Sequence, residues 1–239
     1  MRFRGVAMLE KIRKRLLFEG ADAVGGAYLK GFVPDSMQNL EYGISVQMRL
    51  SQAVVEQIFR ERSPSHTYFH NYRTLNAMLD RCTFLAVSML QKEGYRAVAV
   101  PASQTVDRQM FAGLISHKLV AVKAGMGRIG RHALFISDEF GPAVRLASVL
   151  TDCPICAPEP LFVRQEGCGT CSACAKACPA GAISGREYIP GMPREDFFDA
   201  ECCSNYMKKS FQMIGRGAVC GICMATCQNR WKEKFLKKP

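Results

Sequence analysis

The stretch CGTCSACAKACPAGAI, residues 168–183, places four cysteines within eleven residues and follows the last of them with a proline. Its spacing is Cys168-x2-Cys171-x2-Cys174-x3-Cys178-Pro179. In the bacterial form of this pattern, three cysteines bind one [4Fe-4S] cluster and the fourth reaches a second cluster. Two intervening residues let the loop curl so that successive thiolates meet corners of the same cluster. The stretch therefore predicts a unit built around two iron-sulfur clusters.

A second cysteine group, Cys220-x2-Cys223-x3-Cys227, keeps the end of this pattern but lacks its first cysteine. An upstream thiol must complete the set, and Cys202 and Cys203 are the candidates. By the crossover rule, one cluster takes Cys168, Cys171, Cys174 and Cys227. The other takes Cys178, Cys220, Cys223 and either Cys202 or Cys203.

Disulfides and zinc are the competing explanations for the cysteines. Eleven of the twelve cysteines lie between Cys153 and Cys227, whereas a disulfide framework distributes its bridges through the fold. A structural zinc site takes four ligands, usually from two separated pairs, which does not explain three cysteines at successive spacings of two. We therefore favour iron-sulfur clusters. Cys153 and Cys156 stay open as a redox pair, a further metal site or loop cysteines.

The composition is that of a globular protein, with 48% apolar and 22% charged residues among 239. No apolar run approaches the roughly 18 residues that span a bilayer, and residues 1–20 lack an export segment. We expect a cytoplasmic protein, no membrane partner and a surface helix at the N-terminus. The formal charge of +11 falls to roughly +7 with two bound clusters. An RNA-binding surface and ordinary solvated helix faces both fit this charge.

Upstream of the cysteines, helical and strand-like patterns alternate. Apolar residues recur at steps of three and four over residues 68–94, which predicts one long helix with Cys82 as a buried core thiol. Strands are predicted within residues 95–103, 132–137 and 144–151, and a helix within residues 114–125. The alternation predicts an α/β (α+β) domain over residues 1–160. A proline-containing connection then leads into a cysteine-rich domain over residues 161–239.

The most unusual segment without cysteines contains Gly125, Gly127 and Gly130. A dinucleotide-binding loop follows a strand and opens a helix, whereas these glycines follow a predicted helix and precede a strand. We therefore expect them to let the backbone turn sharply and approach a large flat ligand or another chain segment.

The segments AGMGRIGRHALFI (124–136) and FGPAVRLASVLTD (140–152), followed by the two cysteine groups, resemble the epoxyqueuosine reductases and the related reductive dehalogenases. The resemblance covers residues 101–228. It implies a nitroreductase-like corrinoid-binding domain, followed by a ferredoxin-like domain whose two [4Fe-4S] clusters reduce a bound cobalamin. The residues that match the family's glycine segment near the corrinoid are Ala124, Gly125, Gly127, Ile129 and Gly130. Cys203, with Tyr206 three residues later, resembles the family's Cys-x2-Tyr pattern, which favours Cys203 over Cys202.

Departures from the family pattern leave the substrate open. Arg128, Arg131 and His132 stand where the family has tryptophan, lysine and asparagine. Residues 101–118 hold no clear equivalent of the proton-donating aspartate of epoxyqueuosine reductases, for which Asp107 is a candidate. We also expect the chain to be truncated relative to them, without their helical-repeat region for tRNA, and to lack the export signal of reductive dehalogenases.

The resemblance predicts an oxidoreductase that takes electrons from a low-potential donor such as ferredoxin or flavodoxin and reduces a small molecule. The reaction needs a proton donor, and the candidates are Tyr68, Tyr72, Asp107 and His117. His117 and Lys118 are also predicted to contact a cofactor phosphate. Three alternatives stay open: an electron-transfer protein that reduces a partner corrinoid protein, a flavin-dependent reductase, and tRNA binding, which rests on charge alone.

Overall fold

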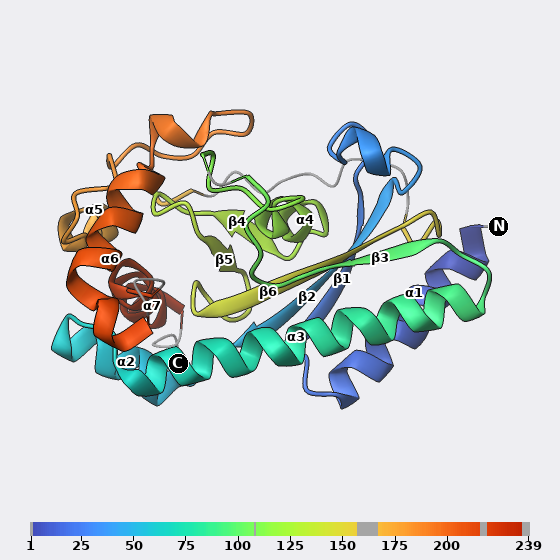
Figure 1. Cartoon of the computed structure of the whole chain (residues 1–239), viewed down its shortest axis with the longest axis horizontal. Coiled ribbons are helices and arrows are strands. Elements are labelled where there is room, and N and C mark those ends of the chain that lie inside the picture. The colour runs from blue at the N-terminus through green and yellow to red at the C-terminus, as the bar shows by residue number, and fades with distance from the viewer. Residues whose placement is uncertain (1, 108, 157–166, 216–218, 236–239) are drawn as a thin grey trace. The chain divides into compact units, whose positions relative to one another are not determined.

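The computed structural model describes residues 2–107, 109–156, 167–215 and 219–235. The helices are α1 (Arg2–Phe18), α2 (Gln52–Glu61), α3 (His66–Lys92), α4 (His117–Lys123), α5 (Ala173–Ala177), α6 (Ala200–Gly215) and α7 (Ile222–Phe235). The strands are β1 (Ala23–Tyr28), β2 (Tyr42–Arg49), β3 (Ala97–Val100), β4 (Gly127–Ile129), β5 (Phe135–Ser137) and β6 (Val144–Thr151). Figure 1 shows this mixture of helices and strands, and the predicted α/β fold class is confirmed.

Two compact units divide the chain, and each is assembled from separate stretches of sequence. The first unit comprises Met1–Arg49, Thr74–Gly127 and Arg145–Val163. The second comprises Leu50–Arg73, Arg128–Val144 and Arg164–Pro239. The cysteine-rich segment thus shares its unit with two upstream stretches. The predicted domain boundary between residues 160 and 161 lies outside the described residues and stays a prediction from the sequence.

The first unit is a four-stranded sheet in the order β1-β2-β6-β3, with helices on both faces. The outer pairs β1–β2 and β3–β6 are antiparallel. Helices α1 and α3 cover one face, and α4 packs on β1 and β2 from the other face (Figure 1).

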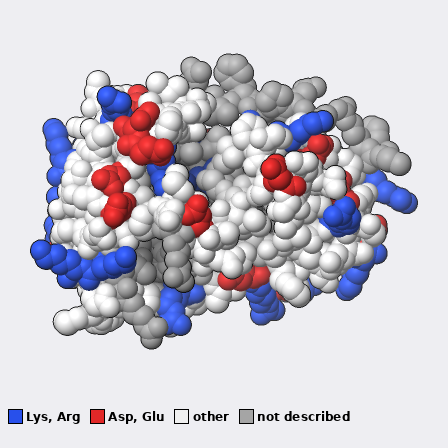
Figure 2. Space-filling view, turned by 45° about the horizontal axis from the view of Figure 1, so that its top comes forward, with Lys and Arg blue, Asp and Glu red and all other residues white. Residues whose placement is uncertain are grey.

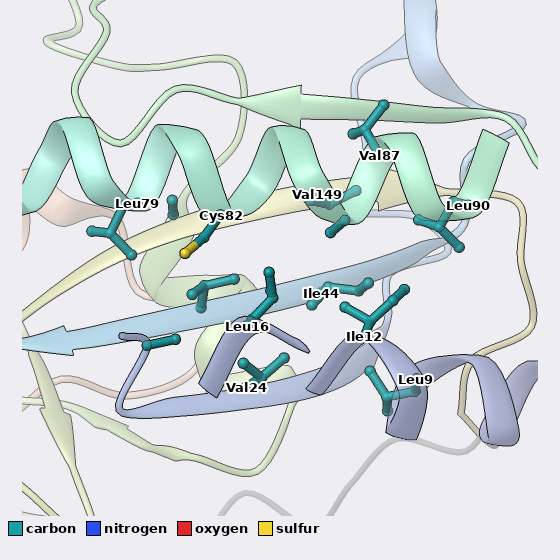
Figure 3. Packing of buried hydrophobic residues seen from close by; sticks show 14 of the residues in the cluster. Leu9, Ile12, Leu16, Val24, Ile44, Leu79, Cys82, Val87, Leu90 and Val149 are labelled. Atoms are coloured by element: carbon teal, nitrogen blue, oxygen red, sulfur yellow. The ribbon is translucent and has the colours of Figure 1, made fainter. Parts of the chain in front are cut away.

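The larger core of this unit lies between the sheet and helices α1 and α3 (Figure 3). Ile12 and Leu16 of α1 are fully buried there, opposite Ile44 of β2. The N-terminal helix predicted at the surface therefore forms, but it buries one face. Helix α3 contributes Leu79 and Cys82, which is 1% exposed, so the prediction of a core thiol is confirmed.

A smaller apolar cluster fills the opposite face of the sheet. Val120 of α4 packs there with Leu150 of β6 and Ile115 just before the helix. The hydroxyl of Ser116 caps α4 by accepting from the amide of Leu119 at 3.4 Å. This cap fixes the start of the helix that leads into the glycine segment.

The second unit gathers α2, the hairpin β4–β5 and helices α5, α6 and α7. Helix α7 packs against α5 and α2. Gln228 of α7 also holds the loop before β6 in position through two hydrogen bonds. Its Oε1 accepts from the amide of Ala143 at 3.1 Å, and its Nε2 donates to Phe140 O at 3.2 Å. These contacts place α7 beside the cysteine-bearing α5.

The long predicted helix and the strand over residues 144–151 agree closely with α3 and β6. Gly94, with φ +84°, follows the end of α3 as expected of a helix terminator. Strands β1 and β2 were not predicted. Among the described residues, no helix is long and apolar enough to cross a membrane.

Candidate functional site

Four cysteines from the loop at residue 168, α5 and α7 form the first thiol group. Burial raises the pKa of Cys174 to about 11, with further contributions from the negative charges of Cys168 and Cys171. Burial likewise raises the pKa of Cys227 to about 12, and Cys168, Cys174 and Cys171 add to it. Such charge effects require the groups to lie close together. Cys227 therefore lies near the three cysteines of the first run, and its role as a ligand of their cluster stays a prediction.

The second thiol group joins Cys178 to cysteines of α6 and α7. Burial raises the pKa of Cys203 to about 11, and the next contributions come from Cys220 and Cys178. Cys223, which is half-buried, has a pKa well above its ordinary value, raised by burial and then by Cys220, Cys203 and Cys178, with a smaller contribution from Cys174 of the first group. This grouping supports the second predicted ligand set.

Cys202 and Cys203 are adjacent in sequence but differ in their surroundings. The thiol of Cys202 donates to Ala180 O at 3.1 Å. In contrast, the pKa of Cys203 is raised first by burial and next by the negative charge of Cys220, a member of the second thiol group. The contacts thus support Cys203 as the ligand, which was also the preference from the family pattern.

The thiol groups suit a multi-iron cluster better than a single ion. All twelve cysteines are free thiols. Within the described ranges, no three His, Cys, Asp or Glu side chains converge closely enough to hold one metal ion. A cubane separates its four thiolates because each thiolate binds a different iron atom, so close convergence on one point is not required. The residues therefore fit two [4Fe-4S] clusters.

Two arginines lie beside the first thiol group. Arg131 donates from Nη2 to Gly169 O, in the loop between Cys168 and Cys171, and from Nη1 to Gly185 O. The positive charge of Arg128 slightly lowers the pKa of Cys227 against the larger effect of burial. Both arginines stand at positions where the sequence departs from the family pattern. Both also form ion pairs, Arg128 with Asp138 at 3.4 Å and Arg131 with Glu187 at 3.7 Å.

Tyr68 and Tyr72, two candidate proton donors, belong to the second unit. Their rings are 6.3 Å apart, edge to face, and Tyr68 is 6% exposed. A side chain at Gly221, whose φ is +79°, would crowd Tyr68, because its Cβ would lie 3.0 Å from the Tyr68 hydroxyl oxygen. Tyr68 thus lies against the loop between Cys220 and Cys223.

The glycine segment begins as the C-terminal cap of α4. Gly125, with φ +70°, donates to Val122 O at 3.0 Å, which closes the helix. The following turn packs tightly on β1, since a Cβ at Gly25 would lie 2.7 Å from Met126 Sδ and 3.1 Å from the Cβ of Ala124. The expected sharp turn is present, and its first neighbour is a strand of the same unit.

The rest of the segment forms the hairpin β4–β5. Ile129 lies half-buried in β4. Gly130 donates to Leu134 O at 2.9 Å, and a Cβ there would lie 2.7 Å from the side chain of Ile136. Gly130 is therefore needed for the close packing of this turn.

His117, at the start of α4, uses both ring nitrogens. Nε2 lies 2.9 Å from Pro101 O and Nδ1 lies 2.9 Å from Ser148 Oγ. A carbonyl can only accept, so Nε2 carries the proton and Nδ1 accepts from the serine hydroxyl. Burial lowers the pKa of His117 below its ordinary 6.5, which favours this neutral form. His117 thereby links α4 to the end of β3 and to the middle of β6. Lys118 follows it, half-buried.

Asp107 lies in an exposed loop of the first unit. Its Oδ1 accepts from the amides of Gln109 and Met110, each at 2.9 Å. The backbone of Asp107 also pairs with Ala112 across the loop. The carboxylate therefore holds its own loop in shape.

Cys153 and Cys156 lie in the first unit, apart from both thiol groups in the sequence. Cys153 is fully buried, and burial raises the pKa of each of these thiols to about 11. A hydrogen bond with the side chain of Tyr95 lowers the pKa of Cys153, but by less than burial raises it. Both are neutral thiols at physiological pH.

The sequence reasoning missed two buried polar residues on β2, Ser45 and Gln47, both 0% exposed. Their side-chain oxygen and nitrogen atoms have no hydrogen-bond partner within the described part of the chain. The available signal was their alternation with Ile44, Val46 and Met48 along one strand.

Comparison with known proteins identifies the cysteine unit and the fold. Residues 167–230 match the family model of a 4Fe-4S double cluster binding domain. The chain is 34% identical over 121 residues to the tetrachloroethene reductive dehalogenase of Desulfitobacterium hafniense, covering 45% of this chain and 21% of that protein. It is 41% identical over 69 residues to the epoxyqueuosine reductase of Escherichia coli (strain K12), covering 29% of this chain and 17% of that protein.

Among solved structures, a reductive dehalogenase described in terms of B12-dependent dehalogenation matches with a TM-score of 0.70 at 18% identity. The match covers 96% of this chain and 34% of that one. The chain thus spans about a fifth of the curated dehalogenase and about a third of the solved one. These findings relate it to iron-sulfur reductases of the reductive dehalogenase and epoxyqueuosine reductase type.

Proposed function

Because the chain shares a double-cluster unit and a fold with iron-sulfur reductases, we propose that it is an oxidoreductase that passes low-potential electrons through two [4Fe-4S] clusters to a bound cobalamin. Its substrate would be a small molecule, and its electron donor a ferredoxin or flavodoxin. The observation that supports the proposal is that cysteines of each predicted ligand set raise one another's pKa, which requires them to lie near one another. The proposed ligand sets follow the crossover pattern of proteins with two clusters.

The clusters and the corrinoid would supply one-electron chemistry that side chains lack. The chain's own contribution begins with eight cysteines that bind iron as thiolates. Because burial raises the pKa of Cys174, Cys203, Cys223 and Cys227, these thiols are protonated without metal. Cluster assembly must therefore displace their protons.

For the corrinoid, we propose the glycine segment of Ala124, Gly125, Gly127, Ile129 and Gly130, with Lys118 and His117 at the start of α4. The fit rests on the sharp turn at Gly125 and on the buried polar atoms of β2 next to that turn. We retain Tyr68 and Tyr72 as the proposed proton donors. Asp107 and His117 stay candidates as well, and each would have to give up a hydrogen bond to the backbone or to Ser148 in order to act.

That engagement of Asp107 and His117 also favours a second candidate function. Electron transfer to a partner needs no proton from Asp107 or His117, so in this role the chain would reduce the corrinoid of a partner protein. tRNA binding has weaker support. On the face shown in Figure 2, acidic and basic side chains of the described residues are intermixed, which does not resemble a continuous basic surface.

The test is to load anaerobically purified, cluster-containing protein with aquocobalamin, remove unbound corrinoid, and record absorption spectra during reduction. The proposal expects about one cobalamin retained per chain, and a cobalt-centred spectral change as the clusters are reduced. Retention of added FMN in place of cobalamin would instead favour the flavin alternative. Failure to retain any corrinoid, while a partner corrinoid protein is reduced, would favour the second candidate function.

Gly125→Ala and Gly94→Ala provide matched variants for this test. Both glycines end helices with positive φ, at +70° and +84°, so alanine strains the backbone comparably at each. Only Gly125 lies in the proposed corrinoid segment. We expect Gly125→Ala to weaken cobalamin retention, and Gly94→Ala to retain it like the unmodified protein.

A further inference from the structure

Strand β2 carries two polar side chains in positions where a buried strand normally holds apolar ones. Ser45 and Gln47 are both 0% exposed. Ser45 Oγ, Gln47 Nε2 and Gln47 Oε1 have no hydrogen-bond partner among the residues that the structure describes. Because both amide atoms of Gln47 lack partners, either orientation of the amide leaves one donor and one acceptor unused.

Strand register places both side chains on the face of the sheet that α4 covers. Ser45 pairs with Gly25, and Gln47 pairs with Ala23. Directly paired residues in an antiparallel sheet point to the same face. A Cβ at Gly25 would meet Met126 and Ala124, and one at Gly43, two residues before Ser45, would meet Val120 of α4. Ser45 therefore lies beside the turn at Ala124–Gly127, and Gln47 lies on the same face of the sheet, two positions further along β2.

Such an arrangement needs a partner that the protein chain does not provide. Buried polar groups in folded proteins are almost always hydrogen-bonded, because leaving them unpaired destabilises the fold. Two adjacent exceptions on one face, beside the segment proposed to hold the corrinoid, indicate a ligand group. Since a hydroxyl and an amide are uncharged, they suit a neutral polar group better than a phosphate or a carboxylate.

We propose that Ser45 and Gln47 form a buried subsite that hydrogen-bonds a peripheral carboxamide of the corrinoid. A primary carboxamide donates and accepts at the same time, which matches the unused donor and acceptor of Gln47. Ser45 supplies a third hydrogen bond from the neighbouring position on the strand. This inference rests on the proposed function and adds the part of the cofactor that β2 recognises.

The test compares Gln47→Met with the unmodified protein, both carrying clusters but no corrinoid. Methionine has a similar length and no hydrogen-bonding amide, so the variant removes the two unpaired buried atoms. We expect its melting temperature without corrinoid to equal or exceed that of the unmodified protein. We also expect its Kd for aquocobalamin, from an anaerobic absorbance titration, to rise by about tenfold or more.

A second probe addresses the carboxamide itself. Cobalamin derivatives with one peripheral carboxamide hydrolysed to a carboxylate should include one that binds the unmodified protein about tenfold more weakly than cobalamin does. Gln47→Met should not distinguish that derivative from cobalamin. Ser45→Ala, a smaller change, should weaken cobalamin binding in the same direction. Gln91→Met, at the exposed end of α3, is the control and should leave binding and melting temperature unchanged.

The experiments distinguish failure of the proposed function from failure of the carboxamide subsite. If the unmodified protein binds no corrinoid, the proposed function and this inference both fall. If it binds cobalamin and both Gln47→Met and Ser45→Ala bind equally well, the inference alone is wrong. A lower melting temperature of Gln47→Met without corrinoid, together with unchanged binding by Ser45→Ala, would show an internal structural role and overturn the subsite.

Discussion

Arg131 connects the glycine segment to the first cysteine run at the level of single hydrogen bonds. Its guanidinium donates to Gly169 O and Gly185 O within the second unit. A positive charge near a cluster stabilises the reduced state, since reduction adds an electron. We expect Arg131→Gln to lower the reduction potential of the cluster held by Cys168 by roughly 50 mV, measured by anaerobic titration with electron paramagnetic resonance.

Arg131→Lys keeps the charge and should recover most of the potential. Arg60→Gln, on the exposed side of α2, is the control for loss of one arginine elsewhere in the second unit. Equal potentials for Arg131→Gln and the unmodified protein would contradict a tuning role.

His117 makes the stability of the first unit depend on pH. Its pKa in the folded protein lies below the ordinary 6.5, so the unfolded chain takes up the proton first as the pH falls. The stabilisation is therefore present above about pH 6.5 and decreases on acidification through that value. Without the two hydrogen bonds, His117→Ala should lose about 1–3 kcal/mol of unfolding free energy at pH 7.5.

At pH 5.5 the difference in unfolding free energy between His117→Ala and the unmodified protein should be smaller, because only the unmodified protein must keep a buried imidazole neutral. Denaturant unfolding at both pH values measures this. His70→Ala, at an exposed helix position, should show the same small effect at both. A difference that grows on acidification would mean that the protonated form of His117 is the one that the fold stabilises.

At the scale of elements, α3 is the main covering helix of the first core. Leu79 is fully buried, whereas its neighbour Met78 is 37% exposed. Leu79→Ala should destabilise the protein by about 2–5 kcal/mol, because truncation leaves a cavity in a packed core. Met78→Ala should stay within about 0.5 kcal/mol. Chemical denaturation followed by circular dichroism distinguishes these outcomes, and equal losses would contradict the packing of α3.

The elements show which local signals the sequence carried. Helix α3 and strand β6 were predictable because their apolar residues repeat at helical spacing or form one continuous run. Strands β1 and β2 were not, since Gly25 and Gly26 weaken the strand pattern of β1, and Ser45 and Gln47 interrupt the apolar run of β2. The pairing of β1 with β2 is a tertiary effect. It is also where the proposed carboxamide subsite lies.

At the scale of the whole molecule, the cysteines were the most informative part of the sequence. Their spacing predicted two clusters, which the matched double-cluster family supports. The crossover between them stays a prediction. The grouping of residues 50–73 and 128–144 with the cysteine-rich segment could not be predicted, because those stretches carry no metal ligand. Their place depends on packing against α7, as in the bonds of Gln228 to Ala143 and Phe140.

The crossover predicts how iron content responds to single substitutions. The unmodified protein should hold about eight iron atoms, and Cys227→Ala about four. The lost cluster should be the one whose potential responds to Arg131, although Cys227 is 59 residues beyond Cys168. Cys202→Ala and Cys82→Ala, at thiols outside both groups, should keep all the iron. Loss of the other cluster in Cys227→Ala would contradict the crossover.

The position of Cys227 on α7 has a consequence for biosynthesis. On the proposed ligand set, a growing chain that has already exposed Cys168, Cys171 and Cys174 offers only three thiolates and an open iron corner. Translation must continue through α7 before the last thiolate arrives. The first cluster would then be completed only after α7 has been translated. Until that moment, the three thiols of the first cysteine run would have no fourth partner from this chain.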